Sequence, residues 1–190
     1  MTIDSEKKKN LEIEIKIKID DSDINDIKKR ILKGKFTLVT RDSFEHNTVF
    51  DTKDGRLKRS KILLRLRNRN NKNILTLKRP SSKAEELKNY KIREEIEAEV
   101  SDFENTKTIL MALGFEIFFI YEKYREVYKK GKIKIMVDRT PIGNFLEIEG
   151  EVEEIDQTAA QLGFDKSDYI TTTYYTLFRK KHKSGFMQFK

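Results

Sequence analysis

Cysteine is absent from this chain of 190 residues, and its absence excludes two classes of small protein. A disulfide-stabilised scaffold needs paired cysteines, and most structural zinc sites use cysteine thiolates as ligands. The chain also lacks any apolar run of the about 20 residues that a transmembrane helix requires. The opening residues carry no apolar core of the kind found in signal peptides. We therefore expect a soluble, cytoplasmic protein that does not associate with membranes.

Several common nucleotide and hydrolase signatures are missing as well. The chain contains no GxGxxG, no GxxxxGK[ST] and no GxSxG, so neither a classical dinucleotide site, a P-loop nor a nucleophile elbow is indicated. Internal repeats and linker-like stretches are also absent. We expect a single domain over residues 1–190, with its core at about 11–178 and a basic, frayed tail at 179–190.

Charged residues are abundant, and the positive ones are in excess. They make up 38% of the chain, with 40 Lys and Arg against 32 Asp and Glu, for a formal net charge of +8. This surplus suggests an anionic partner, which could be nucleic acid, a membrane surface or a phosphate-rich small molecule. The 12 Phe and 7 Tyr supply enough bulk for a hydrophobic core, so wholesale disorder is not expected.

The most regular stretch is LEIEIKIKI at residues 11–19, in which apolar and charged residues alternate without a break. A period of two predicts a β-strand, because successive side chains of a strand point to opposite faces. The apolar face fits a packed sheet. The other face presents Glu12, Glu14, Lys16 and Lys18, which could face water or could hold a cation and an anion.

The same reading predicts a mainly β, α+β fold. The hairpin-like order of the strands favours an antiparallel sheet, with helices at 22–34, from 101 to Gly114, before Gly163 and at 169–178. The predicted strands lie at 11–19, 44–51, 61–69, 74–79, 91–100, 117–128, 133–138 and 144–152.

Like charges are grouped on one face of several of these strands. Arg65 and Arg67 share a face, as do Glu147 and Glu149 in an E-x-E pair that repeats Glu12 and Glu14. Like charges at this spacing repel unless an ion of opposite sign lies between them. About eight strands can close into a barrel. Carboxylate pairs would suit Mg²⁺ or Mn²⁺ inside it, and arginine and lysine rows would suit phosphate oxygens.

These residues resemble the CYTH superfamily, the triphosphate tunnel metalloenzymes, whose name joins class IV adenylate cyclases and thiamine triphosphatases. Glu12-Ile13-Glu14-Ile15-Lys16 is similar to the family's ExExK signature. The resemblance covers residues 11–178 and departs from the family at Val49, where many relatives have a tyrosine. Further segments follow in the family's order, namely Phe50-Asp51-Thr52, Leu64–Arg67, Leu75–Lys78, Arg93–Glu97, Glu122–Arg125, Asp138 and Gly143–Glu149.

The resemblance implies an eight-stranded antiparallel closed barrel, or tunnel, with helices packed outside. It implies a Mg²⁺ or Mn²⁺ site at Glu12, Glu14, Asp138, Glu147 and Glu149, and a catalytic set of Glu12, Glu14, Lys16, Glu147 and Glu149. It implies a triphosphate-binding set of Lys16, Arg65, Arg67, Lys78, Arg93, Lys123 and Arg125. Glu95 and Glu97 would support these ligands or bind an additional metal ion.

Three functions are consistent with such a site. The first is a metal-dependent hydrolase of tripolyphosphate or of an organic or nucleoside triphosphate. The second is a class IV adenylate cyclase, which converts ATP to cyclic AMP and pyrophosphate with the same phosphate grip. The third is a non-catalytic binder of polyphosphate or RNA. The paired carboxylates argue against the third, because they would repel an anion without a cation between them. The sequence leaves the organic part of the substrate, the metal preference and the oligomeric state, monomer or homodimer, undetermined.

Overall fold

The computed structural model describes residues 11–82 and 87–190, which form eight strands and five α-helices. The helices are α1 (Ile24–Lys33), α2 (Arg56–Arg59), α3 (Phe103–Ala112), α4 (Val152–Leu162) and α5 (Tyr174–Lys181). The strands are β1 (Leu11–Ile19), β2 (Thr37–Thr52), β3 (Leu63–Arg69), β4 (Lys72–Pro80), β5 (Lys91–Val100), β6 (Phe115–Lys130), β7 (Ile133–Thr140) and β8 (Gly143–Glu149).

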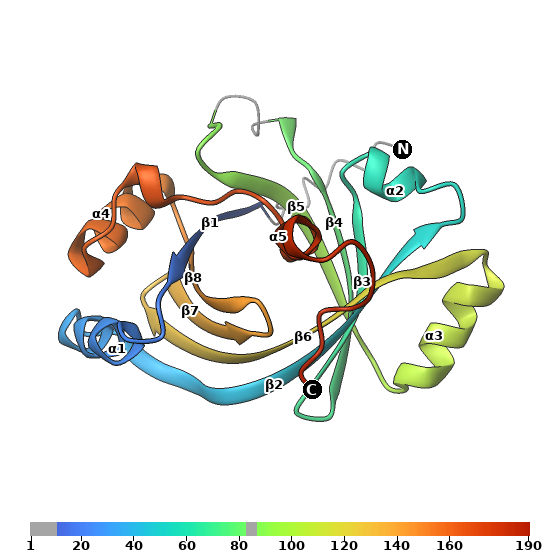
Figure 1. Cartoon of the computed structure of the whole chain (residues 1–190), viewed down its shortest axis with the longest axis horizontal. Helices are drawn as coiled ribbons and strands as arrows, with labels where there is room; N and C mark the ends of the chain where they lie inside the picture. Colours follow the sequence, from blue (N-terminus) through green and yellow to red (C-terminus); the bar gives the residue numbers. More distant parts are fainter. Residues whose placement is uncertain (1–10, 83–86) are drawn as a thin grey trace, which may run out of the picture.

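The eight strands form one closed antiparallel barrel in the order β1-β5-β4-β3-β2-β6-β7-β8 (Figure 1). The predicted fold class is therefore confirmed. β1 closes the barrel by pairing with β5 over Leu11–Glu14 and with β8 over Glu14–Ile19. β5 does not pair with β1 beyond Glu14. There the same edge of β1 pairs with the segment before α5, in which Ile170 donates its N–H to the Lys16 carbonyl at 2.7 Å.

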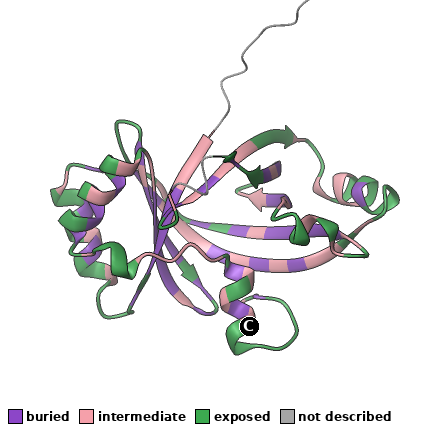
Figure 2. Cartoon of the chain, turned by 90° about the horizontal axis from the view of Figure 1, so that it is seen from above, coloured by how far each residue is buried: buried purple, intermediate pink, exposed green. Residues whose placement is uncertain are grey.

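The hydrophobic core lies largely outside the barrel wall. The outward residues Ile15 and Ile17 of β1, with Ile148 of β8, are buried beneath α1 and α4, which contribute Ile31 and Ile155. α3 covers the outer face of β3 and β6 in the same way. Figure 2 shows the exposed residues gathered on helices and loops, while buried and intermediate residues run along the strands. Because the apolar faces point outward, the charged faces of the strands point into the barrel.

Several predicted strands were too short or ended at the wrong residue. β2 begins at Thr37 rather than near 44, and its first half carries register shifts between Leu38 and Thr40 and between Thr40 and Ser43. Such bulges break the two-residue period on which the prediction relied. β8 ends at Glu149, and α4 begins at Val152 inside the range predicted as strand.

The structure contains one helix more than predicted, and the C-terminal segment differs. Residues 56–59 form the short helix α2 where a loop was expected. α5 starts at Tyr174, after Thr173, whose hydroxyl accepts the Thr176 N–H. The tail is not frayed: Met187 is fully buried and its backbone pairs with Ile120 and Glu122 of β6. The prediction failed because a short basic tail gives no sign of a docking strand.

Candidate active site

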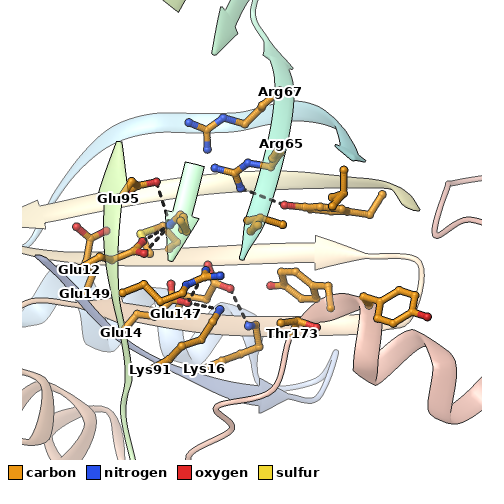
Figure 3. Close-up of a pocket in the computed structure, with 18 of the residues that line it drawn as sticks. Glu12, Glu14, Lys16, Arg65, Arg67, Lys91, Glu95, Glu147, Glu149 and Thr173 are labelled. Carbon is orange, nitrogen blue, oxygen red and sulfur yellow. Dashed lines mark hydrogen bonds and ion pairs between the residues drawn. The ribbon is translucent and has the colours of Figure 1, made fainter. Parts of the chain in front are cut away.

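The inward faces of the strands enclose a cavity of about 1010 Å³. Figure 3 shows Glu14 and Glu147 close to Lys91 and Lys16, with Arg65 and Arg67 across from them on β3. Every residue in the predicted catalytic and phosphate-binding sets lines this one cavity. So do both supporting glutamates and all predicted metal ligands except Asp138. The lining residues predicted from sequence are Glu12, Glu14, Lys16, Arg65, Arg67, Lys78, Arg93, Glu95, Glu97, Lys123, Arg125, Glu147 and Glu149.

The acidic side of the cavity consists of two E-x-E pairs on adjacent strands. β1 and β8 pair so that Glu14 stands opposite Glu149, and Lys16 opposite Glu147. Like charges directly opposite each other destabilise a sheet unless they are compensated. Burial and the nearby Glu14 carboxylate raise the pKa of Glu12. Burial raises the pKa of Glu149 against the opposing charge of Lys134.

Each of these carboxylates also has a basic partner. Glu12 accepts from Lys78 Nζ at 2.5 Å, and Glu14 accepts from Lys91 Nζ at 2.6 Å. The other two carboxylates are paired in the same way: Lys16 Nζ lies 3.1 Å from Glu147 Oε1, and Lys134 Nζ lies 2.6 Å from Glu149 Oε1. The two E-x-E pairs are therefore partly neutralised from the surrounding strands.

The basic side of the cavity is centred on Arg65 and Arg67 of β3. Arg65 donates from Nη1 to the Tyr121 hydroxyl at 3.1 Å and from Nη2 to Thr76 Oγ1 at 3.3 Å. Arg67 donates from Nη2 to Glu97 at 3.3 Å. Burial and the adjacent positive charge of Arg65 lower the pKa of Arg67. Two like charges held this close in a buried site favour binding of an anion between or beside them.

Within residues 11–82 and 87–190, three guanidinium groups have a buried Nε–H without a hydrogen-bond partner, those of Arg65, Arg67 and Arg93. A buried donor that is left unpaired costs about 1–3 kcal/mol, and more when the group is charged. All three side chains line the cavity. Each of these three cavity-lining arginines therefore keeps one donor that no described protein group uses.

Asp138 lies behind the basic row and shares Arg125 with Glu147, because Arg125 Nη2 contacts both carboxylates. It is fully buried and does not line the cavity. Its carboxylate accepts from Lys123 at 2.9 Å, from Arg125 at 2.6 Å and from the Tyr174 hydroxyl at 2.7 Å. Burial and the Asp138 charge raise the pKa of Tyr174. In this arrangement Asp138 anchors two predicted phosphate ligands, and its role as a metal ligand stays a prediction.

Sequence reasoning missed several polar residues of the interior. Lys91 lies in phase with Arg93, Glu95 and Glu97 on β5, so the alternation alone could have identified it. Burial lowers the pKa of Lys91 to about 8, although Glu14 opposes this shift. Tyr174 enters the site from α5, where no strand period applies, and no sequence signal would have identified it.

Glu45 was missed because its face of β2, which it shares with Asn47 and Val49, repeats no charge, although it lies in the regular stretch Ser43–Val49. It is fully buried, and its carboxylate lies 3.5 Å from Arg69 and 3.7 Å from Lys123. Burial alone would raise its pKa, but Lys123, Arg125 and the arginines of β3 hold it at about 2. Glu45 thus supplies a fixed negative charge behind the basic row.

The Glu45→Gln variant is expected to be less stable at neutral pH. A carboxyl with a pKa near 2 in the folded protein and 4.5 as its ordinary value contributes about 3 kcal/mol. Because the folded pKa is lowered, this contribution is complete above pH 4.5 and is lost as the pH falls toward 2. Urea unfolding of wild type and variant should therefore differ at pH 7 and converge below pH 4.5. A difference that stays constant over this range would contradict the assignment.

The donor set of the acidic side fits a divalent cation. Mg²⁺ and Mn²⁺ take oxygen ligands, and Glu12, Glu14, Glu147 and Glu149 offer only carboxylate oxygens. Burial keeps the pKa of Glu12 and that of Glu149 raised despite their basic partners, whereas Lys91 holds the pKa of Glu14 low against burial and Lys16 and Arg125 do so for Glu147. In the side-chain positions described, however, no three acidic or histidine side chains converge closely enough to hold a metal ion.

Comparison with known proteins identifies the family. A model of the CYTH domain matches residues 10–174. The chain belongs to the CYTH family. It is 32% identical over 148 residues to a protein of Methanocaldococcus jannaschii provisionally named an adenylate cyclase, covering 77% of this chain and 81% of the relative.

Solved structures share the CYTH fold. A Vibrio parahaemolyticus protein, provisionally described as an adenylate cyclase, superposes with a TM-score of 0.75 at 15% identity, over 89% of this chain and 98% of its own. A Hippeastrum protein, described as an adenylyl cyclase candidate with a dominant triphosphatase activity, gives a TM-score of 0.60 at 18% identity, over 89% and 95% of the two chains. In the part of the CYTH chain that the structure describes, no helix has the length and apolar character to cross a bilayer.

Proposed function

We propose that this CYTH protein is a divalent-metal-dependent hydrolase of triphosphate substrates. The observation that supports it most strongly is the set of three arginines that line the cavity, Arg65, Arg67 and Arg93, each of which keeps one buried Nε–H without a protein partner among the described residues. Guanidinium groups present a planar fork that matches phosphate oxygens. The acidic pairs across the cavity explain why a cation is needed, because an anionic substrate alone would be repelled there.

The chain's own residues would act on the substrate in two ways. Arg65 and Arg67 would bind the phosphoryl oxygens and neutralise the charge that spreads over them as the P–O bond breaks. Lys123 and Arg125 would extend this grip, held in place by the buried Asp138. Glu12, Glu14, Glu147 and Glu149 would hold a divalent cation, which would supply Lewis-acid stabilisation of the phosphoryl charge when bound. A cavity carboxylate that does not bind the cation would accept the proton of the attacking water.

Product identification tests the proposal. The protein is incubated with tripolyphosphate, ATP or thiamine triphosphate, with Mg²⁺ and separately with Mn²⁺. We expect release of orthophosphate from at least one substrate, and loss of this activity when EDTA removes the metal. Salt-sensitive binding of the same substrates without metal and without turnover would instead support a non-catalytic polyphosphate binder.

The main alternative is an adenylate cyclase, which the provisional names of the Methanocaldococcus and Vibrio proteins favour. The ribose 3′-hydroxyl of ATP would then attack the α-phosphorus and release pyrophosphate. The dominant triphosphatase activity of the Hippeastrum protein favours hydrolysis. The same product assay separates the two, since cyclic AMP and pyrophosphate as the main products from ATP would overturn the hydrolase proposal.

A further inference from the structure

The cavity has an aromatic end that the phosphate-binding residues do not use. Phe118 and Phe119 of β6 line it together with Tyr175 of α5. The rings of Phe118 and Tyr175 are 4.6 Å apart between centroids, and those of Phe119 and Tyr175 are 5.2 Å apart. Val49 and Leu63 add apolar surface to the same wall. This composition suits a planar aromatic group more than a polyphosphate.

A bulge in β6 creates this aromatic end. Val49 pairs with Phe119, and the next residue of β2, Phe50, pairs with Ile117, so Phe118 is the extra residue. In a regular strand, Phe118 and Phe119 would point to opposite faces. The bulge re-aims one of them, and as a result both side chains line the cavity.

Lys58 completes the aromatic end from α2. Its Nζ lies 5.3 Å from the centre of the Phe118 ring and 5.0 Å from that of Tyr175, and 3.3 Å from the Tyr175 hydroxyl. The helix that carries it is fixed by Asp51, whose carboxylate accepts the backbone N–H groups of Leu57 and Lys58. Lys58 therefore provides a positioned donor beside the two rings.

The aromatic end is continuous with the basic side. Arg65 contacts the Tyr121 hydroxyl, the Tyr121 ring lies 6.1 Å from that of Phe119, and Phe119 contacts Tyr175. Because Arg65 and the aromatic end line the same cavity, a ligand held by Arg65 can extend toward α5, whose N-cap residue Thr173 also lines it and is labelled in Figure 3. The cavity volume of about 1010 Å³ lies at the upper end of the about 300–1,000 Å³ that pockets for drug-sized ligands occupy.

We propose that Phe118, Tyr175 and Lys58 form the subsite for the organic part of the substrate, and that the substrate is a triphosphate carrying a planar aromatic group. The aromatic group packs against Phe118 and Tyr175, and Lys58 donates to an acceptor atom on the group or on the unit that links it to the phosphates. This inference rests on the proposed triphosphate function and adds to it the class of substrate.

The test compares affinities across triphosphates that differ only in the organic part. Dissociation constants are measured by calorimetric titration for tripolyphosphate, methyl triphosphate, ATP and thiamine triphosphate, in wild type and in the Phe118→Leu, Tyr175→Leu and Lys58→Ala variants. Phe44→Leu is the matched control, because Phe44 is an exposed aromatic residue that does not line the cavity. Lys58 is exposed, so its variant is expected to fold even where a ring replacement does not.

We expect at least one aromatic triphosphate to bind at least about 10-fold more tightly than tripolyphosphate and methyl triphosphate, as stacking of a base on an aromatic side chain predicts. Each variant of the subsite should reduce this ratio, by about 10-fold for either ring, and Phe44→Leu should leave it unchanged. Equal affinities for all four ligands in wild type, or a ratio that the variants do not alter, would overturn the aromatic subsite while leaving the triphosphate function intact. Failure to bind any of the four ligands would overturn both.

Discussion

The Glu12→Gln and Glu147→Gln variants are each expected to lose at least about 100-fold in kcat/KM for the best triphosphate substrate. Loss of a group that merely supports a metal ligand typically costs 10–100-fold, and loss of a ligand itself should cost no less. Glutamine keeps the size of the side chain and removes its charge, so the change acts on cation binding. Steady-state assays over a range of Mg²⁺ concentrations should also show a higher metal requirement in either variant.

Glu126→Gln is the matched control for this experiment. Glu126 lies on β6 with its carboxylate bound to Lys28 of α1 outside the cavity, so its loss should leave turnover unchanged. Glu147 also pairs with Lys16 and Arg125, and urea unfolding of its variant is needed to separate lost folding from lost chemistry. Full activity in a folded Glu12→Gln or Glu147→Gln protein would refute the role of the acidic pairs.

Much of this fold could be predicted from residues 11–19 and the strands that share their pattern. Five apolar residues at a period of two predicted the strand. The repetition of E-x-E at Glu147 and Glu149 indicated that β1 and β8 face a common interior. The structure places these strands side by side. The prediction worked here because alternation on a regular strand fixes which face each side chain occupies.

The rest could not be predicted, since it depends on interruptions of that period and on contacts between distant segments. Glu45 shares its face with the uncharged Asn47 and Val49, so no charge pattern marked it, and the bulge opposite Val49 hid the second aromatic residue of the cavity. Tyr174 reaches Asp138 from a helix 36 residues farther along the chain, and the Met187 backbone pairs with β6 from a tail with no strand pattern. Lys91 is a different case, because it lies in phase with Arg93 and Glu95 on a regular strand and the alternation alone would identify it.

The division of the barrel into an apolar exterior and a charged interior has an energetic consequence. Buried charges are costly unless they are paired, and the structure pairs nearly all of them across strands, as Lys78 with Glu12 and Lys123 with Asp138. The unpaired Nε–H groups of the arginines are exceptions among the described residues. Buried polar groups that a protein leaves unsatisfied are concentrated where function requires them, which makes the arginine row the sharpest target for mutation.

The Arg65→Lys variant is therefore expected to lose about 100- to 1,000-fold in kcat/KM, comparable to the loss of one preorganised donor in other enzymes. Lysine preserves the positive charge but gathers its donors on one compact nitrogen, so it lacks the planar fork with which Arg65 contacts Tyr121 and Thr76 from two separate nitrogens. The loss should appear with every triphosphate tested, because Arg65 acts on the phosphate chain and not on the organic part.

Arg79→Lys is the control for this substitution. Arg79 lies on β4 with its side chain exposed and paired with Glu94 at 2.8 Å, outside the cavity. The kcat/KM of Arg79→Lys should equal that of wild type. Urea unfolding of Arg65→Lys should show that this variant is folded under the conditions of the assay. Arg65→Lys with wild-type kcat/KM would show that charge alone suffices, and would remove the guanidinium geometry from the basis of the proposed function. A loss confined to one substrate would instead indicate that Arg65 recognises the organic group and does not bind the phosphate chain.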